Sequence, residues 1–265
     1  MKLAVAGKGG VGKTFVSATL ARLFARDGFN VLAVDADSNI NLASSLGIGL
    51  EMAEKIMPLS DNESLVKERT GVLPGKSFGS IFRLTPTVSD IVDKFGIEGP
   101  DGVKLLVMGT VKAADGGCMC PANALLRVLM QHLLIQRKDV IIMDMEAGVE
   151  HLGRGTARRV DAMIVIVEPR MKSVETIKRI MELAKEIEVQ EVLAVGNKIA
   201  RPEEKNFIDR HMTELGIQVA AEIPYDQAVA EADLMGVAPL DYDGQSSAIH
   251  SIIELKDFLR HRYRL

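Results

Sequence analysis

Short apolar runs recur along the whole chain, and they lack the alternation of apolar and polar residues expected of a sheet with one exposed face. Longer segments with apolar residues at helical spacing separate them. Strands buried on both faces and joined by helices are typical of a parallel sheet. The predicted strands are residues 2–6, 30–34, 104–108, 139–143, 162–167, 191–195 and 218–222. This pattern predicts a doubly wound α/β fold with a mostly parallel sheet of seven to eight strands and helices on both faces.

The stretch between the second and third predicted strands, about residues 47–102, has a different character. It contains Pro58, Pro74, Pro86 and Pro100, and only short helical patterns at 51–56 and 62–69. With 265 residues, of which 47% are hydrophobic, the chain is long enough to close one large core. We therefore predict a single domain over residues 1–265 with a partly helical insertion at about 47–102.

Charge and hydropathy narrow the setting. The formal net charge of −4 gives no overall attraction to nucleic acid or to an anionic membrane, so we expect neither as a partner. No apolar run approaches the roughly 20 residues of a spanning helix, and the first residues do not resemble a cleavable leader. These features predict a cytoplasmic protein. In such a reducing compartment, the two cysteines are better suited to thiol or metal chemistry than to a structural disulfide.

The segment GKGGVGKT, residues 7–14, follows the first predicted strand and precedes a predicted helix at 15–26. It matches the phosphate-binding pattern G-x-x-x-x-G-K-[ST] in the required strand, loop and helix context. Backbone N–H groups of such a loop surround an anion, the lysine reaches the β- and γ-phosphates, and the hydroxyl binds Mg²⁺. The predicted nucleotide contacts, for ATP or ADP, are Gly9, Gly10, Val11, Gly12, Lys13 and Thr14. The fold is therefore expected to be that of a P-loop NTPase.

Acidic residues follow two of the predicted strands. Asp35 and Asp37 come after the second strand, where an acid at the carboxyl end faces the nucleotide crevice of an open α/β sheet. Asp144 ends the apolar run VIIM, the pattern of a Walker B motif whose aspartate holds Mg²⁺ through water. Carboxylates also cap helices, and that alternative is strongest for Asp35.

The sequence KGGVGKT, with Lys8 in addition to Lys13, closely resembles the deviant Walker A signature of the MinD/ParA/nitrogenase iron-protein class. The resemblance implies a homodimer that closes over ATP, with Lys8 reaching the partner's nucleotide much as an arginine finger does. It also implies that Asp37 orients or deprotonates the attacking water and that Asp35 supports the Mg²⁺ shell. The alternative for Lys8 is a solvated loop lysine.

Base recognition follows from the same resemblance. The class uses an asparagine after a strand to bind adenine, and Asn197 occupies such a position. The segment from Ile223 through Pro224 to Asp226 resembles the loop that closes over the same ring. On sequence alone, a role for Asn197 as a turn residue is nearly as well supported.

Cys118 and Cys120 are the only cysteines of the chain, and they directly precede Pro121 and a predicted helix at 122–136. A thiol at a helix N-terminus is biased towards the thiolate, the form that binds metal. One pair cannot complete a tetrahedral thiolate site, but two copies related by a two-fold axis can. The alternatives are two small apolar side chains or a redox-active pair.

This Cys-x-Cys segment, with DMEAGVEH at 144–151 and Glu168-Pro169 downstream, resembles the CooC family of nickel-insertion ATPases over nearly the whole chain. The resemblance implies that a nucleotide- or metal-dependent homodimer binds Ni²⁺ through Cys118 and Cys120 of both subunits. Hydrolysis of ATP would then deliver nickel to carbon monoxide dehydrogenase, or to acetyl-CoA synthase. Zn²⁺ is compatible with the same ligands. Glu150 and His151 are assigned no metal role, since such a pair in a polar loop is more often solvated.

Two other functions remain open on the sequence. A positioning ATPase of the MinD/ParA type would need a DNA-binding patch or a membrane-seeking helix, and residues 246–265 combine apolar positions with terminal arginines. We expect this helix to pack on the sheet instead, as most amphipathic helices do. An iron–sulfur carrier would also use sulfur ligands, although reductases of that type have two well-separated cysteines and related carriers a Cys-x-x-Cys.

Overall fold

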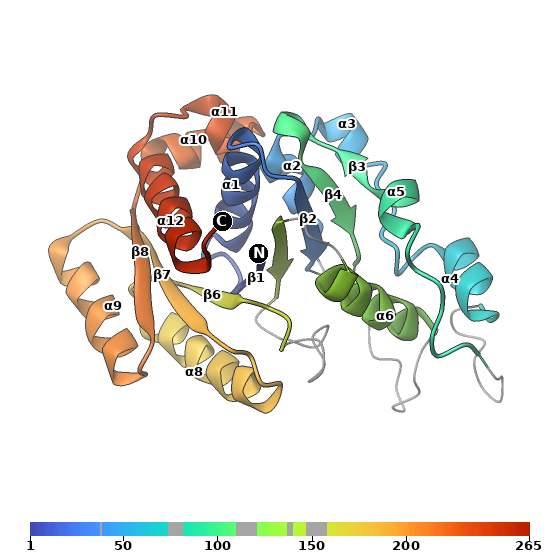
Figure 1. The fold of residues 1–265 in the computed structure, drawn as a ribbon. Coiled ribbons are helices and arrows are strands. Elements are labelled where there is room, and N and C mark those ends of the chain that lie inside the picture. The colour runs from blue at the N-terminus through green and yellow to red at the C-terminus, as the bar shows by residue number, and fades with distance from the viewer. Residues whose placement is uncertain (38, 74–81, 110–120, 137–139, 147–157) are drawn as a thin grey trace.

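The protein is described by a computed structural model over residues 1–37, 39–73, 82–109, 121–136, 140–146 and 158–265. These residues form one eight-stranded sheet in the order β3-β4-β2-β5-β1-β6-β7-β8 (Figure 1). Its strands are β1 (Lys2–Gly7), β2 (Val31–Ala36), β3 (Ile97–Glu98), β4 (Lys104–Val107), β5 (Val140–Met145), β6 (Ala162–Val167), β7 (Val192–Ile199) and β8 (Gln218–Pro224). All neighbouring strands are parallel except β3 and β4, so the predicted fold class is confirmed.

Helices cover both faces of the sheet. They are α1 (Lys13–Arg26), α2 (Leu42–Leu46), α3 (Leu50–Ala53), α4 (Glu63–Thr70), α5 (Ile91–Phe95), the 3-10 helix η1 (Pro100–Gly102), α6 (Pro121–Gln136), α8 (Met171–Glu186), α9 (Pro202–Glu214), α10 (Gln227–Met235), α11 (Pro239–Tyr242) and α12 (Ser247–Tyr263). In Figure 1, α1, α2 and α12 lie on one face and α6, α8 and α9 on the other.

The continuous apolar strands follow from this layering. Leu3 and Val5 of β1 belong to the apolar cluster beneath α1 and α12, whereas Ala4 and Ala6 belong to the cluster beneath α6 and α8. Successive side chains of a strand point to opposite faces, so a sheet covered on both faces needs apolar residues at every position.

The segment from residue 47 to residue 102 contains α3, α4, α5, η1 and β3, and β3 forms the edge of the sheet beside β4. Its backbone is bound to the end of β4, because the N–H groups of Leu59 and Ser60 donate to the carbonyl oxygens of Val107 and Met108 at 3.0 Å each. The two-residue antiparallel β3 is not among the predicted strands. A segment that short carries no periodicity from which it could be recognised.

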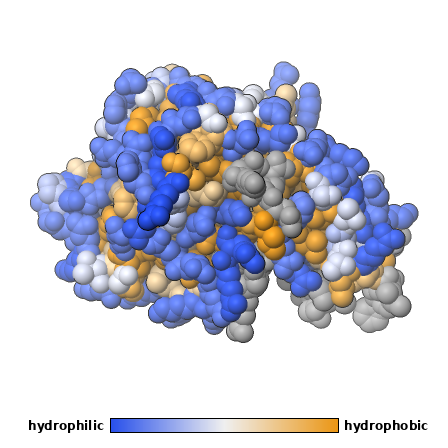
Figure 2. All heavy atoms as spheres, in the orientation of Figure 1, coloured by the Kyte–Doolittle hydropathy of each residue, from blue (hydrophilic) through white to orange (hydrophobic). Residues whose placement is uncertain are grey.

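Helix α12 packs on the core as predicted. Its residues Ile249, Ile252, Leu255 and Leu259 are fully buried in the same apolar cluster as α1. Polar residues dominate the face seen in Figure 2, and apolar residues appear there in patches between them. Over the described ranges of the chain, no helix has both the length and the apolarity needed to cross a membrane.

Candidate active site

The phosphate-binding loop connects β1 to α1 at the middle of the sheet, between the β2/β5 side and the β6/β7 side. Gly10 has φ 81° and Gly12 has φ 95°, both in the left-handed region that glycine adopts most readily. Gly12 is also crowded, since a Cβ atom placed on it would lie 2.3 Å from Nδ2 of Asn197. The loop therefore requires glycine at Gly12 for its backbone conformation and for the approach of β7.

Asp35 and Asp144 lie opposite each other on the neighbouring strands β2 and β5, and both are buried. The Asp35 carboxylate accepts hydrogen bonds from the backbone N–H groups of Asp37 and Leu42, at 3.2 and 3.1 Å. Burial raises the pKa of Asp35 to about 7, and the charge of Asp144 adds to the increase, while the two hydrogen bonds oppose it.

Asp144 contacts the first turns of α1. Its Oδ1 accepts a hydrogen bond from Oγ of Ser17 at 3.3 Å. Burial raises its pKa to about 6, against the lowering effects of a hydrogen bond with Thr14 and the charge of Lys13. Two buried carboxyl groups with raised pKa values are costly to ionise, so a bound cation would stabilise their charged forms.

These oxygen atoms suit Mg²⁺. The ion prefers oxygen ligands and is usually held by one or two carboxylates, substrate phosphates and water. Within the described ranges, no group of three or more histidine, cysteine, aspartate or glutamate side chains could hold a metal ion. A site made of the Thr14 hydroxyl, the Asp144 carboxylate and nucleotide phosphates matches that preference.

Lys13 and Asp37 face each other across the loop. The Lys13 ammonium lies 3.7 Å from Oδ2 of Asp37, and both side chains are largely buried. The Asp37 carboxylate also accepts the backbone N–H of Asn39 at 3.0 Å. Lys8, by contrast, is exposed on the same loop, which is the position required of a group that would reach another subunit.

On the other side of the loop, β7 supplies two consecutive side chains. Nδ2 of Asn197 donates to the carbonyl oxygen of Val11 at 2.7 Å, and Nζ of Lys198 donates to that of Gly10 at 2.6 Å. The Lys198 ammonium also pairs with Glu168 at 2.7 Å. Oδ1 of Asn197 accepts the backbone N–H of Lys198 at 2.9 Å, so both ends of this buried amide have partners, and its contact with a base stays a prediction.

Pro224 ends β8 next to the end of β7, where it is paired with Ile199. The backbone N–H of Tyr225 donates to the carbonyl oxygen of Ile199 at 2.9 Å, and the Tyr225 ring is exposed. The predicted base-binding elements therefore lie at adjacent strand ends, although their contacts with a nucleotide stay a prediction.

The proposed metal ligands Cys118 and Cys120, and the pair Glu150 and His151, lie outside the described residues. Helix α6, Pro121–Gln136, contains the helix predicted at 122–136 and begins one residue earlier.

Three polar residues of the site have no role assigned from the sequence: Ser17, Glu168 and Lys198. Ser17 could have been found, because it lies one helical turn after Thr14 and so shares its face. Lys198 could not, because consecutive residues of a regular strand point to opposite faces.

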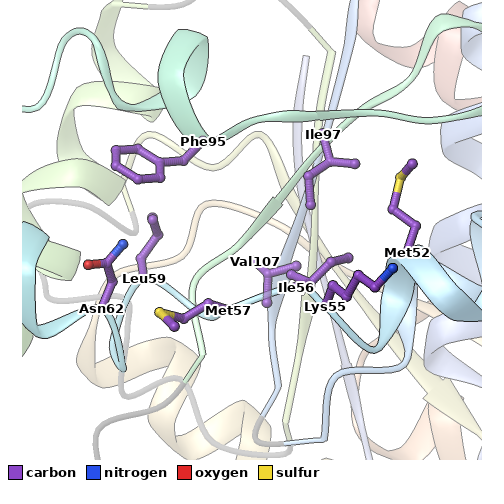
Figure 3. Close-up of a pocket in the computed structure, with 9 residues that line it drawn as sticks. All are labelled: Met52, Lys55, Ile56, Met57, Leu59, Asn62, Phe95, Ile97 and Val107. Atoms are coloured by element: carbon purple, nitrogen blue, oxygen red, sulfur yellow. The ribbon is translucent and has the colours of Figure 1, made fainter.

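A separate hollow of about 300 Å³ lies over the insertion (Figure 3). Apolar side chains dominate its lining, with Lys55 and Asn62 as the polar members, and the residues around it are Met52, Lys55, Ile56, Met57, Leu59, Asn62, Phe95, Ile97 and Val107. None of the predicted nucleotide contacts lines it, and its apolar wall is unsuited to a polyphosphate.

The fold and the loop define a P-loop nucleotide-binding protein. Residues 2–240 match the family model described as the CobQ/CobB/MinD/ParA nucleotide-binding domain, and the chain belongs to this family. It is an ATPase of the MinD/ParA type.

Relatives cover nearly the full length of the chain. It is 41% identical over 262 residues to an uncharacterized ATP-binding protein of Methanocaldococcus jannaschii, covering 97% of this chain and 99% of that protein. It is 40% identical over 241 residues to the carbon monoxide dehydrogenase accessory protein CooC of Rhodospirillum rubrum, covering 91% and 90%. The resemblance to CooC-type ATPases is thereby confirmed.

Solved structures share the fold at low identity. The septum site-determining protein MinD of Pyrococcus horikoshii, complexed with Mg-ADP, matches with a TM-score of 0.69 at 20% identity, covering 99% of this chain and 97% of that one. The MinC:MinD complex of Aquifex aeolicus matches with a TM-score of 0.69 at 19% identity, covering 98% and 96%.

Proposed function

We propose that this ATPase is a metallochaperone that binds Ni²⁺ through Cys118 and Cys120 of two subunits and delivers it to carbon monoxide dehydrogenase or acetyl-CoA synthase. The observation that carries the proposal is a Cys-x-Cys in a chain 40% identical to a carbon monoxide dehydrogenase accessory protein. Tetrahedral thiolate sites also hold Zn²⁺ well, so both metals belong in the test.

Hydrolysis would use the groups around the loop. Lys13 binds the β- and γ-phosphates, Thr14 and Asp144 hold Mg²⁺, and Asp37 orients or deprotonates the attacking water, with Asp35 behind the Mg²⁺ shell. The bound ion supplies positive charge to phosphates and carboxylates alike. This assignment is supported by the 3.7 Å separation of Lys13 and Asp37 and by the burial of Asp144.

The dimer part of the proposal rests on Lys8, which is exposed on the loop. Lys8→Ala should bind ADP in one subunit as the wild type does, yet fail to form the closed ATP-dependent dimer, because only the charge given to the partner is lost. Light scattering with a non-hydrolysable ATP analogue measures this. If the dimer were unchanged, the alternative that Lys8 is a solvated loop lysine would be favoured.

The metal part is tested by equilibrium dialysis with Ni²⁺ and Zn²⁺, combined with size-exclusion chromatography. Four thiolates from two chains predict one metal ion per dimer, bound more weakly as pH falls because protons compete for sulfur. Replacing either cysteine by serine should abolish metal binding and metal-dependent dimerisation while nucleotide binding persists. One tightly held ion per monomer, or undiminished binding in the double serine variant, would contradict the shared site.

Two rival functions have separate readouts. An iron–sulfur carrier would develop visible absorption after anaerobic loading with iron and sulfide. A membrane-positioning ATPase would co-sediment with anionic vesicles, but Ile249, Ile252 and Leu255 of α12 are buried in the core, which argues against an interfacial helix.

A further inference from the structure

The end of strand β7 departs from regular geometry next to the phosphate-binding loop. Its register with β8 shifts between Gly196 and Ile199, and Lys198 has φ 58°, in the left-handed region that residues other than glycine rarely adopt. This break allows the side chains of Asn197 and Lys198 to reach the same loop, which a regular strand would not. Strained conformations of this kind persist only where surrounding contacts hold them.

Those two side chains hold two consecutive carbonyl groups of the loop. Lys198 binds the carbonyl of Gly10 at 2.6 Å, and Asn197 binds that of Val11 at 2.7 Å. In a trans peptide unit, the C=O and the following N–H point in opposite directions. Holding the carbonyls of Gly10 and Val11 therefore also fixes the directions of two N–H groups: that of Val11, which donates to the carbonyl oxygen of Lys8 at 3.4 Å, and that of Gly12, in the anion-binding segment.

Glu168 keeps the Lys198 ammonium in place. It follows β6, the strand that lies between β1 and β7, and its carboxylate lies 2.7 Å from the ammonium. The backbone N–H of Glu168 donates to Oγ of Ser173 at 3.1 Å, which ties Glu168 to the first turn of α8. Three adjacent strands thus supply the loop, the carboxylate and the ammonium.

We propose that Lys198, held by Glu168, is a positioning residue for nucleotide binding: it acts through the Gly10 carbonyl to keep the phosphate-binding loop in its anion-binding shape. It does not need to touch the nucleotide. This role rests on nucleotide binding by the ATPase and does not depend on nickel. The cysteine variants therefore test the nickel proposal, and the variants below test the positioning role separately.

The test measures the affinity for ADP in the presence of Mg²⁺, by titration calorimetry without any other metal. Lys198→Met should raise the dissociation constant roughly tenfold or more, the effect expected for a lost hydrogen bond from a charged group. Lys198→Arg, which can still donate to both oxygens, should recover most of the affinity. Lys205→Met is the matched control, because it removes another ammonium, paired with Glu222 instead of the loop.

Glu168→Gln separates positioning from simple attraction between Lys198 and the phosphates. If the ammonium acted only by its charge, removal of a nearby carboxylate would strengthen ADP binding. The positioning role requires the opposite, a severalfold weaker affinity, because the ammonium is no longer held against Gly10. Tighter binding by Glu168→Gln, or wild-type affinity in Lys198→Met, overturns the proposal. If Lys198→Met does not fold, the Glu168→Gln and Lys198→Arg variants still decide it.

Discussion

The polar groups on the two sides of the phosphate-binding loop differ in how they are paired. On the acidic side, which consists of Asp35, Asp37 and Asp144, burial raises the pKa values of Asp35 and Asp144, and the Asp37 carboxylate lies 3.7 Å from the Lys13 ammonium. On the anchoring side, which consists of Asn197, Lys198 and Glu168, donors and acceptors are matched at 2.6–2.7 Å. The acidic side is proposed to bind a cation and phosphates, whereas the anchoring side holds the loop backbone through direct hydrogen bonds. A reactive site can tolerate unfavourable charge on one side when the other side holds the backbone.

The largest effect is expected from Lys13→Ala. This variant removes the cation that faces Asp37 and is proposed to bind the phosphates, and it leaves three carboxyl groups beside an incoming polyanion. Nucleotide binding should fall below detection in calorimetry with ADP and Mg²⁺. Lys178→Ala, on the exposed surface of α8, is the control and should bind normally. Measurable binding by Lys13→Ala would show that the anchoring side and the loop N–H groups suffice.

Asp37→Ala should separate binding from turnover. The carboxylate faces Lys13 at 3.7 Å but is not required to hold the loop, so ADP affinity should change little. Loss of a group that orients or deprotonates water typically lowers a rate about 10²- to 10⁴-fold. Phosphate release with ATP and Mg²⁺ measures it, with Asp37→Asn as the isosteric comparison. Hydrolysis at the wild-type rate would show the assignment of Asp37 to be wrong.

The sequence indicates more of the acidic side than of the anchoring side, for a physical reason. Gly12, Lys13, Asp37 and Asp144 stand at fixed offsets from apolar runs, and a parallel sheet brings the carboxyl ends of its strands together. The structure further places Asp35 opposite Asp144 on neighbouring strands, which the sequence does not predict because it does not give the order of the strands in the sheet. The contact of Lys198 with Gly10 depends on a register shift and on one residue in the left-handed region. Neither feature produces a recognisable pattern in the amino-acid sequence.

The fold shows the same division. Long buried strands such as β5 and β6 are predicted to within about two residues, because a short apolar run between two helical patterns fits few structures except a buried strand. Between residues 47 and 102, the helices α3 and α4 overlap the predicted helical patterns at 51–56 and 62–69. The short β3 and α5 are not predicted, since their identity depends on what they pack against.

Gly12→Ala should break the contact between the loop and the anchoring side. Gly10→Ala provides a close control: both glycines have positive φ, but a Cβ at Gly10 meets no atom within 4 Å, whereas one at Gly12 lies 2.3 Å from Nδ2 of Asn197. Both variants should lose about 1 kcal/mol of stability to backbone strain. Gly12→Ala should weaken ADP binding about tenfold more than Gly10→Ala, as expected for one disrupted hydrogen bond. Equal losses would mean that Asn197 is not important for the loop.

Asp144→Asn tests whether the buried charge of Asp144 destabilises the fold, because removing that charge should change how the stability depends on pH. The pKa of Asp144 is raised from 3.8 to about 6, so the folded protein holds this proton more tightly than the unfolded chain does. The folding stability gained from the protonated Asp144 is fully present below about pH 4 and is lost as the pH rises through about 6. Without nucleotide, the variant should be more stable than the wild type at about pH 8, by up to about 3 kcal/mol.

Urea unfolding at about pH 5 and about pH 8 measures this difference, and the gap between variant and wild type should widen at the higher pH. Asp93→Asn, at an exposed position on α5, is the control and should show no such widening. Despite its greater stability, Asp144→Asn should lose hydrolysis that depends on Mg²⁺. A gap that did not change with pH would contradict the raised pKa.

Ser17→Ala should give the smallest effect, because the hydrogen bond that it removes is long, 3.3 Å between Oγ and Oδ1 of Asp144. Loss of this donor removes one of the influences that lower the pKa of Asp144, so the carboxylate becomes slightly harder to keep charged. The Mg²⁺ concentration for half-maximal hydrolysis should rise about two- to threefold, equivalent to about 0.5 kcal/mol. Ser251→Ala on α12, whose hydroxyl donates to the carbonyl oxygen of Ser247 in the same helix, should leave it unchanged. A tenfold rise in Ser17→Ala would instead place this hydroxyl among the direct Mg²⁺ ligands, beside Thr14.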